Sequence, residues 1–248
     1  MAPNPRLGYL LCLLCRDNFT YTYAVLYNQI HDFAAFLPWH RYYVMVYEKA
    51  LRDYGYTGVA MYWNWYPVTG FDGNGVDTGD NGIRKRVIDG PFKDWRPAYW
   101  HNSFQPHWLS RDWSPPQFGE PELRGARYSP AEMATVNNNT VFDDFRRTLE
   151  NGPHAAVHGG VGGAGDNRGL GDMGLNNASP SDPLFFLHHT QVDRLWWLWQ
   201  QKNPSVRIME YNGNFPTPDG SPGPALSLND KLPMGGLAAD GAKLCYKY

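Results

Sequence analysis

The sequence predicts a mainly α-helical fold with long loops and a few short β-strands. Helix-start and helix-stop residues gather at four places along the chain, and Gly/Pro-rich stretches separate these places. Two of the stretches, 68–129 and 159–180, are long enough to predict loops that build or cover a site. After residue 203 short apolar runs alternate with turn residues, which predicts a few small strands that end at 244–248.

Each predicted helical region carries a helix signal at one end or at both. Pro38 is a favoured first-turn residue and Gly55 is a stop signal, while Ser-Pro-Ala-Glu at 129–132 is a capping box. The predicted helical regions are 17–29, 38–55, 129–158 with an interruption before 140, and 181–201.

Length and composition predict one globular domain spanning 1–248, because the 248 residues show no repeat and no internal shift in composition. The net charge of −2 gives no basic stripe of the kind that nucleic acid or an anionic membrane surface requires. No apolar run approaches the length of a membrane span. We therefore expect neither nucleic acid nor a membrane as a partner, and composition predicts no oligomeric state.

The N-terminal segment and the cysteines bear on the compartment. The apolar run 7–15 has the length of a short signal core, but no small-residue cleavage pattern follows it, which favours a helix of the mature domain. One disulfide between Cys245 and either Cys12 or Cys15 would tie the two ends together and leave one thiol over. Disulfides persist in oxidising compartments, so we expect an extracellular protein. Three Asn-x-Ser/Thr sequons agree with secretion, at Asn18, Asn138 and Asn177.

Histidines carry the clearest chemical signal. His154 and His158 are four residues apart, so on a helix their imidazoles project from one face and can bind one ion. His189, inside the fourth helical region, can complete a set of three, and neutral imidazole suits copper, zinc, iron and nickel. The spacing alone leaves a solvated surface pair as an alternative. No His-Glu-x-x-His motif supports a zinc hydrolase.

Two longer motifs surround these histidines. Residues 36–41 read Phe-Leu-Pro-Trp-His-Arg, with His31 before them, and residues 182–196 read Asp-Pro-Leu-Phe-Phe-Leu-His-His-Thr-Gln-Val-Asp-Arg-Leu-Trp. At these residues the chain resembles the type 3 copper proteins, most closely the short fungal tyrosinases and catechol oxidases, which are polyphenol oxidases. The resemblance covers nearly the whole chain, including Tyr-Trp-Asn-Trp at 62–65 and Leu-Glu at 149–150.

The resemblance implies a four-helix bundle core with a dinuclear copper site, in which each antiparallel helix pair supplies three histidines to one ion. Facing helices of bundles commonly carry metal ligands, which agrees with the positions of the histidines. The resemblance assigns His189 rather than the adjacent His188 to the metal, and gives Arg41 and Asp193 the role of orienting ligands. The ligands carried over are His31 and His40 for the first copper, and His154, His158 and His189 for the second.

The first copper site departs from the family pattern. A third histidine is expected about eight residues before His31, where this chain has Tyr23, and no other histidine precedes His31. Tyrosine binds copper(II) only as phenolate, which is costly at a pKa of about 10 unless the metal lowers it. We therefore expect two copper ions with an incomplete first site, in which Tyr23 is a weak ligand or only fills space. His101 and His107, in the long loop, are alternative sources of the missing ligand.

Residues on the substrate side favour diphenols. In the family, a glutamate matching Glu150 and an asparagine directly after the first ligand of the second copper position a water that deprotonates monophenols. This chain has Ala155 at the second position, and a methyl group cannot orient water, so diphenols become the favoured substrates. Phe185, one helical turn before His189, is expected to form a wall of the pocket, and Leu175 or Asn176 to form its gate.

We therefore predict a copper-dependent oxidoreductase that converts small o-diphenols, with monophenols as a second candidate class, to o-quinones using molecular oxygen. Tyr23 keeps two alternatives open. One is a tyrosinase-like copper protein with impaired or no turnover, and the other is an oxygen-binding protein of the hemocyanin kind.

Overall fold

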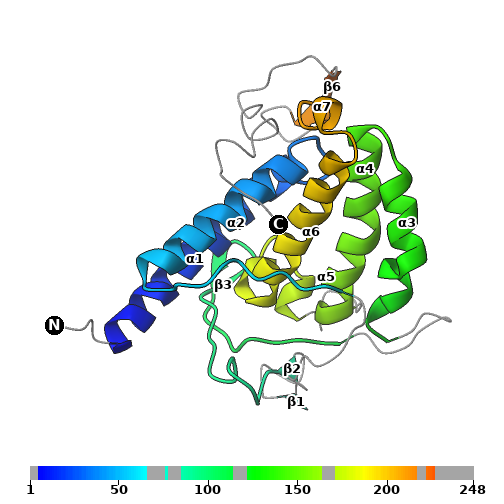
Figure 1. Cartoon of the computed structure of the whole chain (residues 1–248). Coiled ribbons are helices and arrows are strands. Elements are labelled where there is room, and N and C mark those ends of the chain that lie inside the picture. The colour runs from blue at the N-terminus through cyan, green and yellow to red at the C-terminus, as the bar shows by residue number, and fades with distance from the viewer. Residues whose placement is uncertain are drawn as a thin grey trace.

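The computed structural model describes residues 5–65, 76–77, 85–113, 122–163, 171–216 and 222–226. Most of this part is helical, as the sequence predicts (Figure 1). The α-helices are α1 (Pro5–Ile30), α2 (Phe36–Asp53), α3 (Pro130–Asn138), α4 (Phe142–Leu149), α5 (Ala155–Gly162), α6 (Leu184–Gln201) and α7 (Pro204–Arg207).

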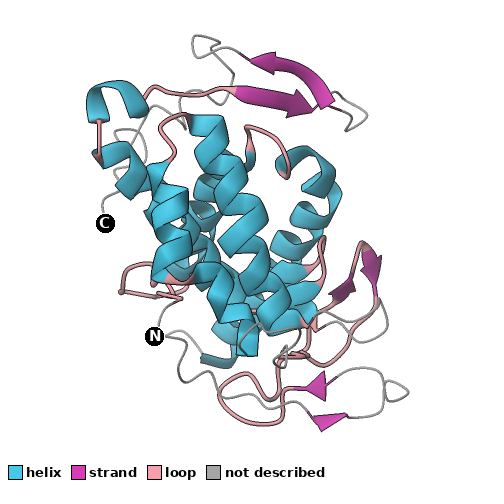
Figure 2. Cartoon of the chain, turned by 90° about the vertical axis from the view of Figure 1, so that its right-hand side faces the viewer, coloured by secondary structure: helices cyan, strands magenta, loops and turns pink. Residues whose placement is uncertain are grey.

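Short helical turns and two-stranded antiparallel ladders complete the described part, with the strands at the edge of the helical body (Figure 2). The turns are η1 (Glu122–Tyr128), η2 (Glu150–His154), η3 (Asp172–Gly174) and η4 (Ser179–Ser181). The strand pairs are β1 (Val76–Asp77) with β2 (Lys85–Arg86), β3 (Tyr99–Trp100) with β4 (Ser103–Phe104), and β5 (Gly213–Pro216) with β6 (Pro222–Leu226). The predicted strand at 244–248 lies outside the described residues.

The helices form two sets on either side of α6, one made of α1 and α2 and the other of α4 and α5. α1 packs against α2 and α2 packs against α6, while α4 and α5 lie beyond α6 (Figure 1). Aromatic side chains join α4 to α6, where the Phe145 ring stacks on Trp199 with centroids 5.1 Å apart. The mainly helical fold is therefore confirmed. Side chains from both sets of helices point into the interior between them.

The third helical region is more broken than predicted. Ser129 caps α3, as the capping box predicts, and Asn139 ends it in an extended conformation. After α4 the chain passes through η2, a π-type turn in which Gly152 has non-helical angles (φ −100°, ψ −106°) and Pro153 follows. Apolar periodicity does not reveal such a turn, because the residues on either side of it keep helical angles.

The first two helices differ from prediction mainly in where they begin. α1 begins at Pro5, well before residue 17, and α2 begins two residues before Pro38. Gly55 follows α2 with φ +93°, in the left-handed region that glycine adopts without steric cost, so the predicted stop signal is confirmed.

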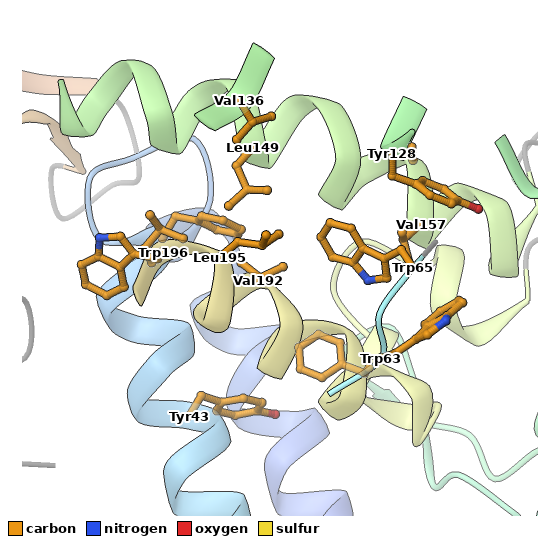
Figure 3. Close-up of a cluster of buried hydrophobic side chains, with 14 of the residues drawn as sticks. Tyr43, Trp63, Trp65, Tyr128, Val136, Leu149, Val157, Val192, Leu195 and Trp196 are labelled. Atoms are coloured by element: carbon orange, nitrogen blue, oxygen red, sulfur yellow. The ribbon is translucent and has the colours of Figure 1, made fainter. Parts of the chain in front are cut away.

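Aromatic side chains dominate the core next to α6. Trp63 and Trp65, from the segment after α2, insert between the helices together with Tyr128 (Figure 3). The Trp63 backbone N–H donates to the Leu187 carbonyl over 3.0 Å, which ties this segment to α6. Part of the high aromatic content of the chain therefore forms the hydrophobic core.

A buried ion pair joins α2 to α6. Arg41 Nε donates to Asp193 Oδ1 over 2.5 Å, and both side chains are at most 3% exposed. The guanidinium also lies 3.8 Å from the centre of the Trp196 ring. Because a desolvated charge depends on its partner, this pair fixes the register between the two helices.

The described part of the chain bears on a membrane span but not on the disulfide. None of its helices combines the length and apolar character needed to cross a bilayer. Cys245 and the side chains of Cys12 and Cys15 lie outside the described residues, so the disulfide and the extracellular location stay predictions.

We predict that Asp193→Ala lowers the free energy of unfolding by about 3–5 kcal/mol, because Arg41 loses its buried partner. The control is Asp53→Ala, which removes the exposed Lys49–Asp53 pair of α2 and should change stability little. Chemical denaturation measures both. Equal effects of the two substitutions would show that the buried pair does not hold the helices.

Candidate metal centre

The structure brings the five histidines predicted as ligands into one cluster, together with Tyr23. They come from the end of α1, from α2, from η2 and α5, and from α6. Neighbouring rings lie 4.3 to 6.3 Å apart between centroids, for the pairs His31–His40, His31–His154, His40–His189, His154–His158 and His154–His189.

Backbone carbonyls orient most of these rings. A carbonyl oxygen only accepts hydrogen bonds, so each bonded Nδ1 carries the proton and each Nε2 keeps its lone pair for a metal. The bonds are His31 Nδ1 to Tyr27 O (3.1 Å), His40 Nδ1 to Phe36 O (2.7 Å), His154 Nδ1 to Glu150 O (2.9 Å) and His158 Nδ1 to Met173 O (2.8 Å).

Several ring nitrogens at the centre of the cluster have no protein partner. Within the described residues, His40 Nε2, His154 Nε2 and His189 Nδ1 are buried and make no hydrogen bond. Buried polar atoms are rarely left unpaired, because the loss of hydration is not repaid. Ligand atoms of His154, His158, His188 and His189 all lie within 4.8 Å of one another. Metal coordination would satisfy these nitrogens, so the donor set fits copper.

Burial also keeps the rings in the form that binds metal. Desolvation lowers the pKa of His31 to about 3 and that of His158 to about 4. It lowers the pKa of His40, His154 and His189 well below the ordinary value. The imidazoles are therefore neutral near pH 7, and a metal ion need not displace protons from them.

The two halves of the cluster touch directly. The His40 ring on α2 stacks on the His189 ring on α6, with centroids 4.3 Å apart and an interplanar angle of 11°. The Arg41–Asp193 pair lies one residue beyond His40 on α2 and one helical turn beyond His189 on α6. The ion pair that sets the helix register thus also sets the distance between the predicted ligands of the two metals.

Tyr23 lies at the place that the sequence register predicts, beside His31 and His40. Its side chain is 1% exposed, and its hydroxyl donates to His31 Nε2 over 2.9 Å. Burial raises the pKa of Tyr23 well above its ordinary value, so without metal the group is a neutral phenol. Tyr23 thus occupies the nitrogen through which His31 would bind metal.

The two loop histidines have other partners. His101 Nδ1 lies 2.6 Å from Asn177 Oδ1 at the surface. His107 is buried, and its Nε2 lies 2.7 Å from Asp172 Oδ1. Neither belongs to the cluster in the described part of the chain, which leaves Tyr23 as the group beside the first pair of histidines.

Glu150 stands next to the cluster with both oxygens engaged. Arg146 Nη1 donates to Oε2 over 2.6 Å, and the Asp32 backbone N–H donates to Oε1 over 2.7 Å. Burial raises the pKa of Glu150 to about 7, while these two donors act in the opposite direction. The carboxyl group is therefore held in one orientation at the edge of the site.

Three of the clustered histidines, His31, His154 and His158, line a cavity of about 290 Å³. Glu150 and Ala155 line it, and the predicted gate residues Leu175 and Asn176 do so too. Phe185, predicted as a pocket wall, is not among its lining residues. It is fully buried, with its ring centroid 4.1 Å from that of His189, so it supports the ligand from behind.

Sequence reasoning missed two contributors to this site and assigned a smaller part to a third. The Met173 carbonyl orients His158, and no sequence signal marks a backbone acceptor in a loop. Arg146 holds Glu150 through a hydrogen bond. This contact could have been predicted, because Arg146 precedes Glu150 by four residues on a predicted helix. His188 was expected beside the site, but its fully buried ring also brings a nitrogen close to the ligand atoms of its neighbours.

Comparison with known proteins gives the family. The model of the common central domain of tyrosinase matches residues 14–202. The tyrosinase-like protein phomQ1 of Diaporthe leptostromiformis is 34% identical over 94% of this chain and 67% of its own length. Tyrosinase ustQ of Aspergillus flavus is 34% identical over 94% of this chain and 68% of its own length.

A solved structure agrees on the fold. A polyphenol oxidase from Thermothelomyces thermophila superposes with a TM-score of 0.59 at 23% identity, over 85% of this chain and 72% of its own. With the matched central domain and the buried histidine cluster, the conclusion is that this chain belongs to the tyrosinase family of type 3 copper proteins.

Proposed function

We propose that residues 1–248 form one domain that uses two copper ions to oxidise small o-diphenols to o-quinones with molecular oxygen. The observation that carries the proposal is the convergence of buried, neutral histidines from two helix sets beneath a cavity of about 290 Å³. That volume lies at the small end of ligand pockets, which suits a phenol with a single ring.

The reaction requires electrons and protons to leave the diphenol together. Two diphenols lose four electrons and four protons, and one dioxygen takes them up to form two waters. Bound copper supplies the redox chemistry that passes these electrons to oxygen. Glu150, on the cavity wall, is the proton acceptor that we assign, because Arg146 and the Asp32 N–H hold its carboxylate in place.

Selectivity for diphenols rests on the residue after His154. Ala155 lines the cavity next to Glu150 and offers no polar atom beyond its backbone. A water beside Glu150 then finds no side-chain partner at position 155 that would orient it toward a monophenol. Diphenols give up a proton more readily, so their oxidation does not depend on such an oriented water.

Tyr23 supports a second candidate, a copper protein with impaired turnover. With His31 and His40 as its only imidazoles, the first site has one strong donor fewer than the second. The Tyr23 hydroxyl also competes for His31 Nε2. Copper content of the unmodified protein separates the two candidates.

We predict that His154→Ala, His158→Ala and His189→Ala each abolish copper binding at the second site, because a site with two imidazoles competes poorly for metal. His101→Ala, at the surface, is the control and should keep the copper. His188→Ala should also keep it, since the family pattern assigns the metal to His189. Elemental analysis gives copper per chain, and wild-type copper in all three ligand variants would contradict the assignment.

Catechol-type substrates should be oxidised far faster than tyrosine-type monophenols. Ala155→Asn should narrow that gap by giving a water beside Glu150 its second partner. The measurement is the ratio of kcat/KM for a diphenol and its matching monophenol in both proteins. A monophenol rate equal to the diphenol rate, without a lag, in the unmodified protein would refute this account.

Tyr23→His should raise both copper content and catechol oxidation, because a third imidazole strengthens the first site. We expect the unmodified chain to hold little more than about one copper and the variant to approach two at equal copper exposure. Tyr23→Phe is the matched control, since it keeps the ring and removes the hydroxyl. Two full coppers in the unmodified protein would show that its first site is already complete.

A further inference from the structure

Arg124 reaches the cavity from outside the four helices that carry the histidines. It belongs to η1 and has φ +57°, a left-handed backbone that side chains rarely adopt. Its half-buried side chain lines the same cavity as His31, His154 and His158. A residue held in this backbone region beside a ligand cavity indicates a constraint of function.

The guanidinium fills space that a glycine leaves free. Gly159 directly follows His158, and a Cβ atom built on Gly159 would lie 2.7 Å from Arg124 Nη1 and 2.9 Å from its Cζ. Any side chain at position 159 would therefore push the guanidinium away. Because Gly159 has no side chain, the positively charged guanidinium of Arg124 can lie close to the part of α5 that contains His158.

No partner for the charge of Arg124 lies among the described residues. Arg124 makes no hydrogen bond or ion pair within the described residues, and it is the only cation that lines the described cavity. Of the two acids that line this cavity, Asp32 also lines a second cavity together with Arg146 and Arg147. Glu150 itself is bound to Arg146. A guanidinium presents five N–H donors, so Arg124 offers donors to a ligand.

We propose that Arg124 binds a carboxylate of the substrate, so that the preferred substrates are single-ring o-diphenols with a carboxylate on a short arm. The proposal rests on the proposed diphenol oxidation and adds its substrate class. Arginine pairs with carboxylates through two parallel hydrogen bonds, which orients a ligand as well as attracting it. Arg124 is thus a specificity residue that acts on the far end of the substrate, while the ring lies over the histidines.

The kinetic test compares 3-(3,4-dihydroxyphenyl)propionate with its primary amide, which has the same shape and no charge. In the unmodified protein kcat/KM should favour the acid by about tenfold or more. Arg124→Gln should abolish this ratio, chiefly through KM of the acid, and Arg124→Lys should retain part of it. Arg52→Gln removes an exposed positive charge from the far part of α2 and should leave the ratio unchanged. Equal ratios in wild type and Arg124→Gln would overturn the proposal.

A binding measurement keeps this test separate from the proposed function. Calorimetry with 3-phenylpropionate and 3-phenylpropanamide, which cannot be oxidised, reports the carboxylate contact in copper-loaded protein whether or not diphenols turn over. Loss of the preference for the acid in both Arg124→Gln and Gly159→Ala would support the contact, because the second variant keeps the charge but displaces it. Undiminished preference in Arg124→Gln would overturn it, even in a protein that oxidises catechols well.

Discussion

Backbone carbonyls that hold the histidine rings are the constraint on which the rest of the site depends. Each ring bonded at Nδ1 presents the lone pair of Nε2 inward, and for three of the four the carbonyl belongs to the residue four positions earlier. The chain therefore fixes the tautomer and the ring direction locally, before any metal binds. Burial then keeps the rings neutral. What remains for the tertiary structure is to bring the prepared rings together.

Packing between α2 and α6 performs that task. The His40 and His189 rings meet face to face, and the Arg41–Asp193 pair lies directly beside them in both helices. A shift of one helix along the other would break a desolvated ion pair as well as the ring contact. Stability and metal geometry therefore depend on the same few side chains, so substitutions in this interface should affect both.

Much of this arrangement could be predicted from the sequence, because helix signals and histidine spacing are local. The four helical regions and the place of Tyr23 beside His31 followed from such patterns. The π-type turn did not, since one non-helical glycine leaves the apolar periodicity intact. Nor did the Met173 carbonyl or the guanidinium beside Gly159, because both contacts join segments far apart in the chain. Contacts between loops and helices depend on packing that no local pattern encodes.

The π-type turn η2 has a consequence for how this protein can vary in length. It sets the rotation with which α5 starts, and hence the direction of His158 relative to the turn that ends at His154. Losing or gaining one residue there would rotate α5 by about 100° about its axis and shift it by about 1.5 Å. Insertions and deletions inherited by descendants of this chain should therefore avoid 150–158, even though its sequence, with Gly152 and Pro153, looks like a permissive loop.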